Sequence, residues 1–212
     1  MIKRKTLTAL IFMALVCLPL CAAPRFFIGA NFNYDANMLS DVYLDRLEGL
    51  PDDVYNGGNI SGLHAVGPKF ELILLPFKNF PLGFGITSTT MFNVGYMGGG
   101  SGSYFSYKFD FRQDLGLNLF FQKAFSHTWG LFADLGLMYS WYRIATENKA
   151  NSKADVEYIR FTNWGVSADF GVYLENKGSF FKVGATLYYD LENMSDFAFR
   201  YGLTLGGGVT LG

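Results

Sequence analysis

The stretch 105–121 constrains the fold of this chain more than any other segment. Apart from one glutamine, every second residue in it is apolar, and the residues between are mostly polar or charged. Successive side chains of a β-strand point to opposite sides, so this pattern predicts a strand with one apolar and one polar face. A soluble sandwich buries such an apolar face, whereas a transmembrane barrel turns it toward lipid and keeps the charges in its lumen.

The first 22 residues have the features of a secretory signal peptide. Three basic residues precede an apolar stretch over 7–20, and small residues follow at Ala22 and Ala23. The apolar stretch is too short for a comfortable membrane-spanning helix. We expect cleavage after Ala22, which predicts a signal peptide over 1–22 and a single barrel domain over 23–212.

Both cysteines, Cys17 and Cys21, lie within this leader. The mature chain is therefore expected to contain neither a disulfide nor a thiolate metal ligand. The alternative is a lipoprotein cleaved before Cys21, although Leu20 is a poor small residue for the position that precedes a lipidated cysteine.

Composition excludes two other classes of protein. Removing the three cations of the leader leaves 14 basic and 18 acidic residues, without a basic stripe of the kind that binds nucleic acid. No run of 18 apolar residues follows the leader, which excludes a helical membrane protein. Aromatic residues make up 18% of the chain, as expected for strands that carry interfacial aromatic belts.

Alternation like that of 105–121 occurs in eight runs. They cover 26–34, 66–74, 82–96, 105–121, 129–141, 164–174, 181–191 and 197–211. Most exceed the mean strand of a soluble protein and reach the roughly 9 to 11 residues that cross a bilayer at a tilt. Because Pro68 lacks an N–H for the ladder, we expect a bulge or local irregularity there. The predicted fold class is all-β, an eight-stranded antiparallel up-and-down transmembrane β-barrel.

The connections between the runs alternate in length. Tight turns are predicted at 76–81, 122–128 and 176–179, whereas the other side carries the long loops 35–59 and 145–157 and the shorter 97–103 and 193–196. Outer-membrane barrels have short periplasmic turns and longer extracellular loops. With an even number of strands, both termini are then expected to be periplasmic.

Aromatic residues gather near both ends of the runs, as interfacial belts do. The group near the tight turns is Phe77, Phe80, Phe120, Phe121, Trp129, Phe180 and Phe181. The group toward the loops is Tyr96, Phe105, Tyr107, Tyr139, Trp141, Tyr189, Phe197 and Phe199.

With eight alternating runs behind a leader, the chain resembles the small eight-stranded outer-membrane barrels, the group that includes OmpX, OmpW and the membrane domain of OmpA. The resemblance covers nearly all of the mature chain and rests on pattern rather than on a short motif. It implies insertion by the barrel-assembly machinery into outer-membrane lipid. The chain departs from the group at its end, because it closes on Val209, Thr210, Leu211 and Gly212 instead of an aromatic residue.

The interior of an eight-stranded barrel is just wide enough to be filled by its side chains. The predicted lumen residues comprise five cations and six anions: Lys69, Glu71, Lys108, Asp110, Arg112, Asp114, Asp134, Asp169, Lys182, Asp190 and Arg200. Near balance favours a network of cross-strand ion pairs, because an unpaired buried charge costs several kcal/mol. The alternative is a narrow polar path for a small solute or ion.

The sequence gives little support for an enzyme. Barrels of this size that act on lipid place a His with Ser or acidic partners near the outer rim. Of the two histidines, His127 falls in a tight turn on the opposite side, and His64 lies near the outer start of a strand with Ser61 close by. No cofactor is predicted, and no metal site either, since neither His has a second His or Cys at ligand spacing.

The loops are the remaining candidates for function, because loops on a rigid scaffold often carry it. Within loop 35–59, Ser40 can cap a short amphipathic helix. The leading hypothesis is a non-enzymatic barrel that anchors loops 35–59 and 145–157 for contact with an extracellular, host or envelope ligand. The competing hypothesis, implied by the resemblance to OmpW, is a narrow passive channel or carrier for small molecules, hydrophobic ones included.

Overall fold

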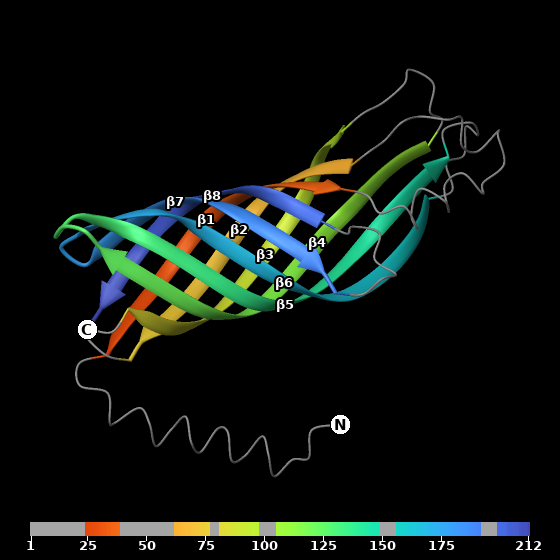
Figure 1. Cartoon of the computed structure of the whole chain (residues 1–212). Coiled ribbons are helices and arrows are strands. Elements are labelled where there is room, and N and C mark those ends of the chain that lie inside the picture. Colours follow the sequence, from red (N-terminus) through yellow and green to blue (C-terminus); the bar gives the residue numbers. More distant parts are fainter. Residues whose placement is uncertain (1–23, 39–61, 77–80, 98–104, 149–155, 192–198) are drawn as a thin grey trace, which may run out of the picture.

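A computed structural model places the eight alternating runs in one closed barrel (Figure 1). It describes residues 24–38, 62–76, 81–97, 105–148, 156–191 and 199–212. The strands are β1 Arg25–Met38, β2 Gly62–Leu75, β3 Leu82–Met97, β4 Phe105–Ala124, β5 Trp129–Asn148, β6 Val156–Asn176, β7 Ser179–Asp190 and β8 Phe199–Leu211. The predicted fold class is confirmed, whereas the predicted signal peptide over 1–22 lies outside the described residues.

Every strand pairs antiparallel with its sequence neighbours, and β1 pairs with β8 to close the barrel. At the start of β1, Arg25 pairs with Leu75 at the end of β2, and Phe26 pairs with Leu211 at the end of β8. The first and last described strands therefore have their terminal ends on the side of the tight turns. Figure 1 shows this end with the C-terminus and the start of β1 together. We call it the turn side, and the opposite end the loop side.

The turn between β6 and β7 shows why the short connections are tight. Asn176 pairs with Ser179, so only Lys177 and Gly178 connect the strands. Both have positive φ, 46° and 82°, which is the backbone of the two-residue hairpin turn whose twist matches that of the strands. The glycine takes this conformation without steric cost, so the local sequence sets the register of the hairpin.

Three neighbouring strands are longer than the rest and change the predicted loop boundaries. β4, β5 and β6 have 20, 20 and 21 residues, and they extend beyond the other strands on the loop side (Figure 1). The ladder of β3 on β4 ends at Met91 and Arg112, while β4 remains paired with β5 as far as Phe105. The predicted loop 145–157 is therefore wrong at both ends, because 145–148 belong to β5 and 156–157 to β6.

Loop 35–59 also begins later than predicted. Residues 35–38 continue β1, since their backbones pair with β2 and β8. The remainder of this loop, including the short helix predicted from Ser40, lies outside the described residues. The polar composition of 35–37 suggested a loop, but polar side chains are what the lumen of a barrel accommodates.

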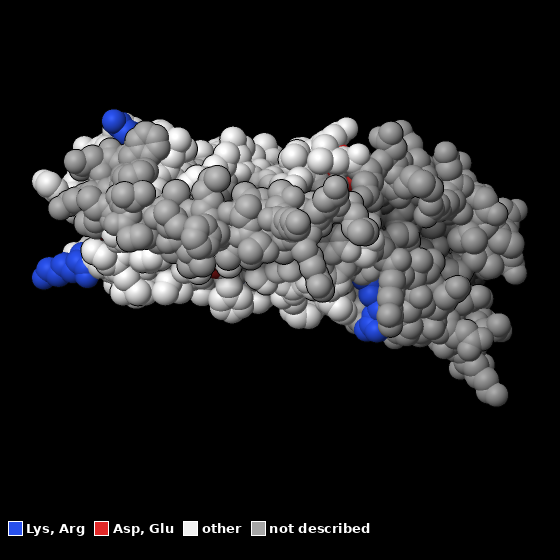
Figure 2. Space-filling view, turned by 90° about the horizontal axis from the view of Figure 1, so that it is seen from below, with Lys and Arg blue, Asp and Glu red and all other residues white. Residues whose placement is uncertain are grey.

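The two faces of the wall differ as predicted. Outward side chains are large and apolar, with exposed fractions such as 66% for Leu117 and 60% for Leu203, whereas the next lumen-facing residue on β4, Asn118, is 7% exposed. Figure 2 shows Lys and Arg at the ends of the described surface and only small patches of acidic atoms between them. Apolar side chains outside and polar side chains inside are the arrangement of a barrel surrounded by lipid.

The alternation is interrupted at two places. The β2 and β3 ladder shifts register between His64 and Ala65, and not at Pro68. At Gly67 and Pro68 the ladder lacks its pairs to β3, but Val66 with Phe92 and Lys69 with Thr89 keep one register, so the irregularity predicted at Pro68 is a missing pair and not a bulge. A second shift lies between Phe109 and Phe111, within the stretch whose alternation seemed unbroken in sequence. No described helix is long and apolar enough to cross a bilayer.

Candidate functional site: the barrel lumen

The turn-side part of the lumen is filled by a cluster of apolar side chains. It comprises Phe27, Ile73, Leu75, Phe120, Phe132, Tyr173 and Phe180, and we call it the apolar plug. The rings of Phe27 and Phe180 meet edge to face with centroids 5.3 Å apart, and Phe120 stacks on Phe132 at 6.3 Å. The hollow within the plug has a volume of about 10 Å³, about the minimum for one water, and a second hollow of about 300 Å³ at the turn-side mouth reaches Leu75 and Tyr173.

Ion pairs cross the lumen next to the plug. Along β2, Ile73 of the plug is followed toward the loop side by Glu71 and then Lys69. Glu71 pairs with Lys182 of β7, and Lys69 pairs with Asp169 of β6. All four side chains are buried, and each pair spans the barrel rather than joining adjacent strands. The pairs therefore tie opposite walls together.

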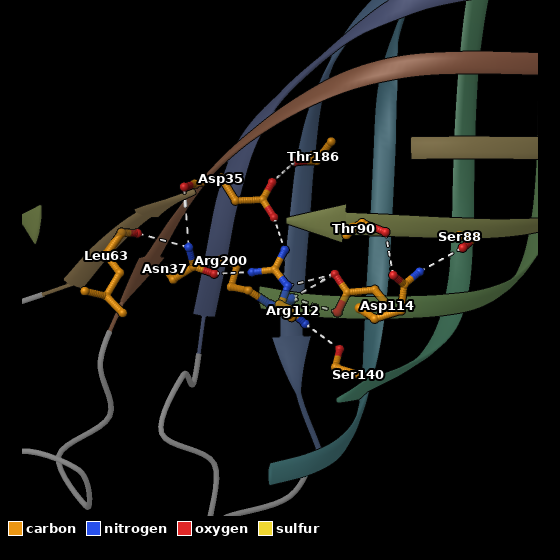
Figure 3. Close-up of polar contacts among 11 residues, drawn as sticks. Asp35, Asn37, Leu63, Ser88, Thr90, Arg112, Asp114, Ser140, Thr186 and Arg200 are labelled. Atoms are coloured by element: carbon orange, nitrogen blue, oxygen red, sulfur yellow. Dashed lines mark hydrogen bonds and ion pairs between the residues drawn. The ribbon is translucent and has the colours of Figure 1, made fainter. Parts of the chain in front are cut away.

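The loop-side part of the lumen is organised around two arginines. Arg112 forms ion pairs with Asp35 and with Asp114, the latter at 2.9 Å, and donates a further hydrogen bond to Asn37. Arg200 pairs with Asp114 at 3.1 Å. Figure 3 shows these contacts converging from several strands. We call Arg112, Arg200, Asp35, Asn37, Asp114 and Ser140 the arginine cluster.

The arginine cluster is buried, and Arg200 has partners in addition to its ion pair. Arg200 donates to Ser140 at 3.0 Å, and its guanidinium lies 3.3 Å from the ring centroid of Tyr188. Arg112 is 1% exposed, and Asp114 is 3% exposed. Charges held in this way interact strongly because little water screens them, provided that each has its partner.

The side chains of nine of the eleven predicted lumen residues are described, and all nine are buried in the barrel interior. Seven of them make the ion pairs above, and the other two accept hydrogen bonds. Asp134 accepts from Asn118 at 2.6 Å, and Asp190 accepts from Asn163 at 2.9 Å. The side chains of Lys108 and Asp110 lie outside the described residues.

Asp35 and Asn37 complete the arginine cluster but were not among the predicted lumen residues. Asp35 was predicted to lie in loop 35–59, yet the spacing of Asn31, Asn33, Asp35 and Asn37 continues the period of a strand. That polar alternation was the available signal. The partner choice was not predictable, since Arg112 and Asp35 are 77 positions apart.

The prediction of two aromatic belts is correct in part. On the turn side, Phe121, Trp129 and Phe181 are exposed on the outer wall. Phe120 and Phe180 were assigned to the same belt, but they lie in the apolar plug with exposed fractions of 5% and 7%. Phe77 and Phe80 lie outside the described residues. Of the loop-side group, Tyr189 and Phe199 are exposed and Tyr139 and Trp141 are half-buried.

For the remaining members of the loop-side group, the structure describes either the backbone alone or nothing. They are Tyr96, Phe105, Tyr107 and Phe197. The correction at Phe120 and Phe180 has a simple cause. Each occupies the lumen-facing phase of its strand, and an apolar residue in that phase fills the barrel.

The described partner of His64 is Tyr34, and not the serine or acidic residue that a catalytic histidine would need. Its Nδ1 atom is 2.7 Å from the hydroxyl of Tyr34, and the two rings stack with centroids 5.8 Å apart. Ser61, the predicted neighbour, lies outside the described residues. His127 is exposed in a turn, as predicted. Among the described residues, no group of three or more His, Cys, Asp or Glu could hold a metal ion.

No family model matches the chain, and no curated protein matches it. Solved structures do share its architecture. The attachment invasion locus protein Ail of Yersinia pestis has 9% identity and a TM-score of 0.51, with 90% of this chain and 100% of that one covered. Neisserial surface protein A has 14% identity and a TM-score of 0.53 over 88% and 96%.

A third solved structure shares the architecture at a similar identity. A major outer membrane protein from Thermus thermophilus has 12% identity and a TM-score of 0.54, with 90% of this chain and 100% of that one covered. At such identities the similarity shows the fold. Together with the closed barrel, its outward apolar face and its filled polar lumen, it assigns this chain the fold of the small eight-stranded outer-membrane β-barrels.

Proposed function

We propose that this protein is a non-enzymatic barrel of the outer membrane that anchors loops at the cell surface. Its turn side and both termini face the periplasm, and the loops that follow β1 and β5 face outward. These loops contact an extracellular, host or envelope ligand. The proposal is supported by the division of the molecule into a closed, rigid barrel and long connections on one side only.

The observation that carries the proposal is the closed lumen. Any solute that passed through the barrel would have to displace the apolar plug and then separate the ion pairs of Lys69, Lys182 and the arginine cluster. Separating a buried pair leaves uncompensated charge, which costs about 3 to 5 kcal/mol. A lumen filled in this way stabilises the barrel and is a poor path for solutes.

Planar-bilayer recording tests this conclusion. The purified, refolded chain is expected to leave the bilayer silent, with its strand content checked by circular dichroism in the same preparation. Reproducible conductance that disappears or changes in an Arg112→Met variant would support the competing function, a narrow channel for small molecules. Conductance that Arg112→Met leaves unchanged would indicate bilayer leakage and not passage through this lumen.

Insertion into the bilayer has its own test. Leu117 is the most exposed of the large apolar side chains that the structure describes, and Leu117→Arg is expected to reduce the free energy of unfolding in lipid by about 2 to 4 kcal/mol. The matched control, Leu117→Phe, keeps an apolar side chain at this position. If both variants unfold at the same urea concentration, the outer face of β4 does not meet hydrocarbon.

The surface role agrees with one structural neighbour. Ail is described as an attachment invasion protein, and a related structure holds it with the heparin analogue sucrose octasulfate. Contact with a ligand through surface loops is what we propose for this chain. With 9% to 11% identity, the likeness supports the scaffold, and the ligand has to be found by experiment.

The non-enzymatic part of the proposal is tested at His64. This residue donates to or accepts from Tyr34 and stacks on it, which is the contact of an interfacial pair. His64→Ala and Tyr34→Phe are expected to leave unchanged the lipid composition of the membrane that contains the protein. A lipid modification that requires wild-type His64 and survives Tyr34→Phe would contradict the proposal.

A further inference from the structure

The hollow at the turn-side mouth has no role in closing the lumen. It has a volume of about 300 Å³, at the lower end of the range of small-molecule sites, and it ends on the apolar plug at Leu75 and Tyr173. We call it the mouth cup. Beyond the plug, its described lining includes Arg25, Lys123, Glu175, Pro81 and Trp129.

The two charged residues at the opening of the mouth cup continue the lumen-facing phase of their strands. Arg25 lies two residues before Phe27 of the plug, and Glu175 lies two residues after Tyr173. They form an ion pair across the mouth from β1 and β6, which are not neighbours in the sheet. Both side chains are partly exposed, so a ligand can reach them from the turn side.

The turn between β4 and β5 forms one side of the mouth cup and is fixed by its own contacts. Ser126 Oγ accepts hydrogen bonds from the backbone N–H groups of Thr128 at 3.1 Å and Trp129 at 3.2 Å. The ring of Trp129 packs against that of Phe125 with centroids 5.0 Å apart, and Trp129 is 43% exposed. The cup therefore has a preformed apolar side next to its charged groups.

The electrostatics of the mouth cup favour a ligand with a single negative charge. Its described lining has two cations, Arg25 and Lys123, and one carboxylate, Glu175. Arg25 bonds to Glu175 through Nη2, and this is the one hydrogen bond described for its guanidinium. Because a guanidinium has five N–H donors in a planar fork, Arg25 has donors left for a second carboxylate.

We propose that the mouth cup binds a monoanionic carboxylate that carries an apolar group. The carboxylate bonds to Arg25, and the apolar group packs against Trp129 and Pro81, where it leaves water. A phosphate dianion fits less well, because it brings two charges next to Glu175. The C-terminus of a peptide and a free small acid both offer the proposed chemistry, and titration with each kind distinguishes them.

The plug makes the mouth cup a binding site and not the entrance of a path. A ligand that enters from the turn side meets Leu75 and Tyr173 at the floor and goes no further. The inference thus goes beyond the anchoring function and needs neither the loops nor conductance. The proposed orientation of the barrel enters at one point only, since it makes the periplasm the source of the ligand.

Isothermal titration calorimetry of the purified, refolded chain tests the proposal. N-acetylphenylalanine is expected to bind one molecule per chain, and its uncharged C-terminal amide should bind about tenfold more weakly, the loss of one charge-assisted hydrogen bond. Arg25→Met should reduce the affinity for the acid to that for the amide. The matched control is Lys177→Met, which removes a turn-side cation outside the described cup lining and should bind like the wild type.

Phenylacetate identifies the source of the ligand, because it has a carboxylate and a ring but no peptide group. Binding as tight as that of N-acetylphenylalanine would support a free acid as the ligand. Clearly weaker binding of phenylacetate would support the C-terminus of a peptide.

Glu175→Gln separates the proposal from a structural effect, because the two predict opposite changes. Removing the competing carboxylate frees Arg25, so the affinity for N-acetylphenylalanine should rise about threefold, within the range of an exposed ion pair. Weaker binding by Glu175→Gln would overturn the proposal. So would equal binding of the acid and the amide, or equal losses in Arg25→Met and Lys177→Met. Circular dichroism checks that each variant keeps its strands, and none of these results changes the test of the anchoring function.

Discussion

The two halves of the lumen are closed by different kinds of interaction. On the turn side the apolar plug fills the barrel by packing, with aromatic rings in edge-to-face and stacked contact. On the loop side the arginine cluster closes it with charges, each held by partners on other strands. Packing tolerates substitutions that keep volume, whereas a buried charge needs its particular partner. The comparison therefore predicts that the loop-side half is the more sensitive to single substitutions.

The largest effect is expected for Arg112→Met. Methionine keeps much of the volume but leaves Asp35 buried without its ion-pair partner. Breaking a buried pair from one side costs about 3 to 5 kcal/mol. Urea unfolding in lipid vesicles, followed by tryptophan fluorescence, measures it. The control Lys123→Met removes an exposed cation from the turn-side end of the same strand and should change little. Equal losses would show that charge removal alone, and not the broken pair, destabilises the barrel.

The double variant Arg112→Met with Asp35→Leu sharpens this result. Removing both partners leaves no stranded charge, so the double variant should be more stable than Arg112→Met by about 1 to 3 kcal/mol. The control combines Arg112→Met with Asp190→Leu, which removes a lumen carboxylate that bonds to Asn163. No recovery is expected there. If both double variants recover alike, net lumen charge matters and the identity of the pair does not.

A smaller effect is expected in the apolar plug. Phe120→Leu keeps an apolar side chain and strands no charge, so it should cost about 1 kcal/mol. Phe121→Leu, the next residue along the strand, changes an outward side chain that is 39% exposed and is expected to be nearly neutral. The same urea titration measures both. A loss at Phe120 as large as that at Arg112 would remove the distinction between the two halves.

The sequence predicted the fold well because a period of two residues survives in every strand. It also predicted nine of the charged residues that lie buried in the lumen, since that follows from the phase of each strand, but it missed Asp35. It could not predict their pairing. Lys69 and Asp169 meet across the barrel from positions 100 residues apart, and which residues face each other depends on the strand stagger that closure imposes.

The plug was missed for a different reason. Aromatic residues near strand ends are typical of lipid belts, and that expectation outweighed the phase of Phe120 and Phe180. The alternation of each strand, taken alone, would have placed Phe120 and Phe180 in the lumen. The start of β4 at Phe105 was predicted correctly, but the loop-side ends of β5 and β6 were missed because pairing, and not alternation, extends these two strands past the rim.

The smallest effect is expected where an ion pair meets solvent. Arg25 pairs with Glu175 at the turn-side mouth, with side chains 27% and 22% exposed, whereas Lys182 and Glu71 are 3% and 0% exposed. Exposed pairs contribute about 0 to 1 kcal/mol, and salt at 1 M shortens the screening length to about 3 Å. Arg25→Met should therefore cost little in 0.1 M salt and nothing measurable in 1 M.

Lys182→Met is the matched comparison, because it removes a cation from the same side of the barrel. Its loss should persist in 1 M salt, since the Lys182 ammonium lies over the ring of Phe132 at 4.9 Å and no solvent separates it from Glu71. If salt instead removed the cost of Lys182→Met as well, water and ions would have to reach the layer next to the plug. The closed lumen, and with it the anchoring function, would then be contradicted.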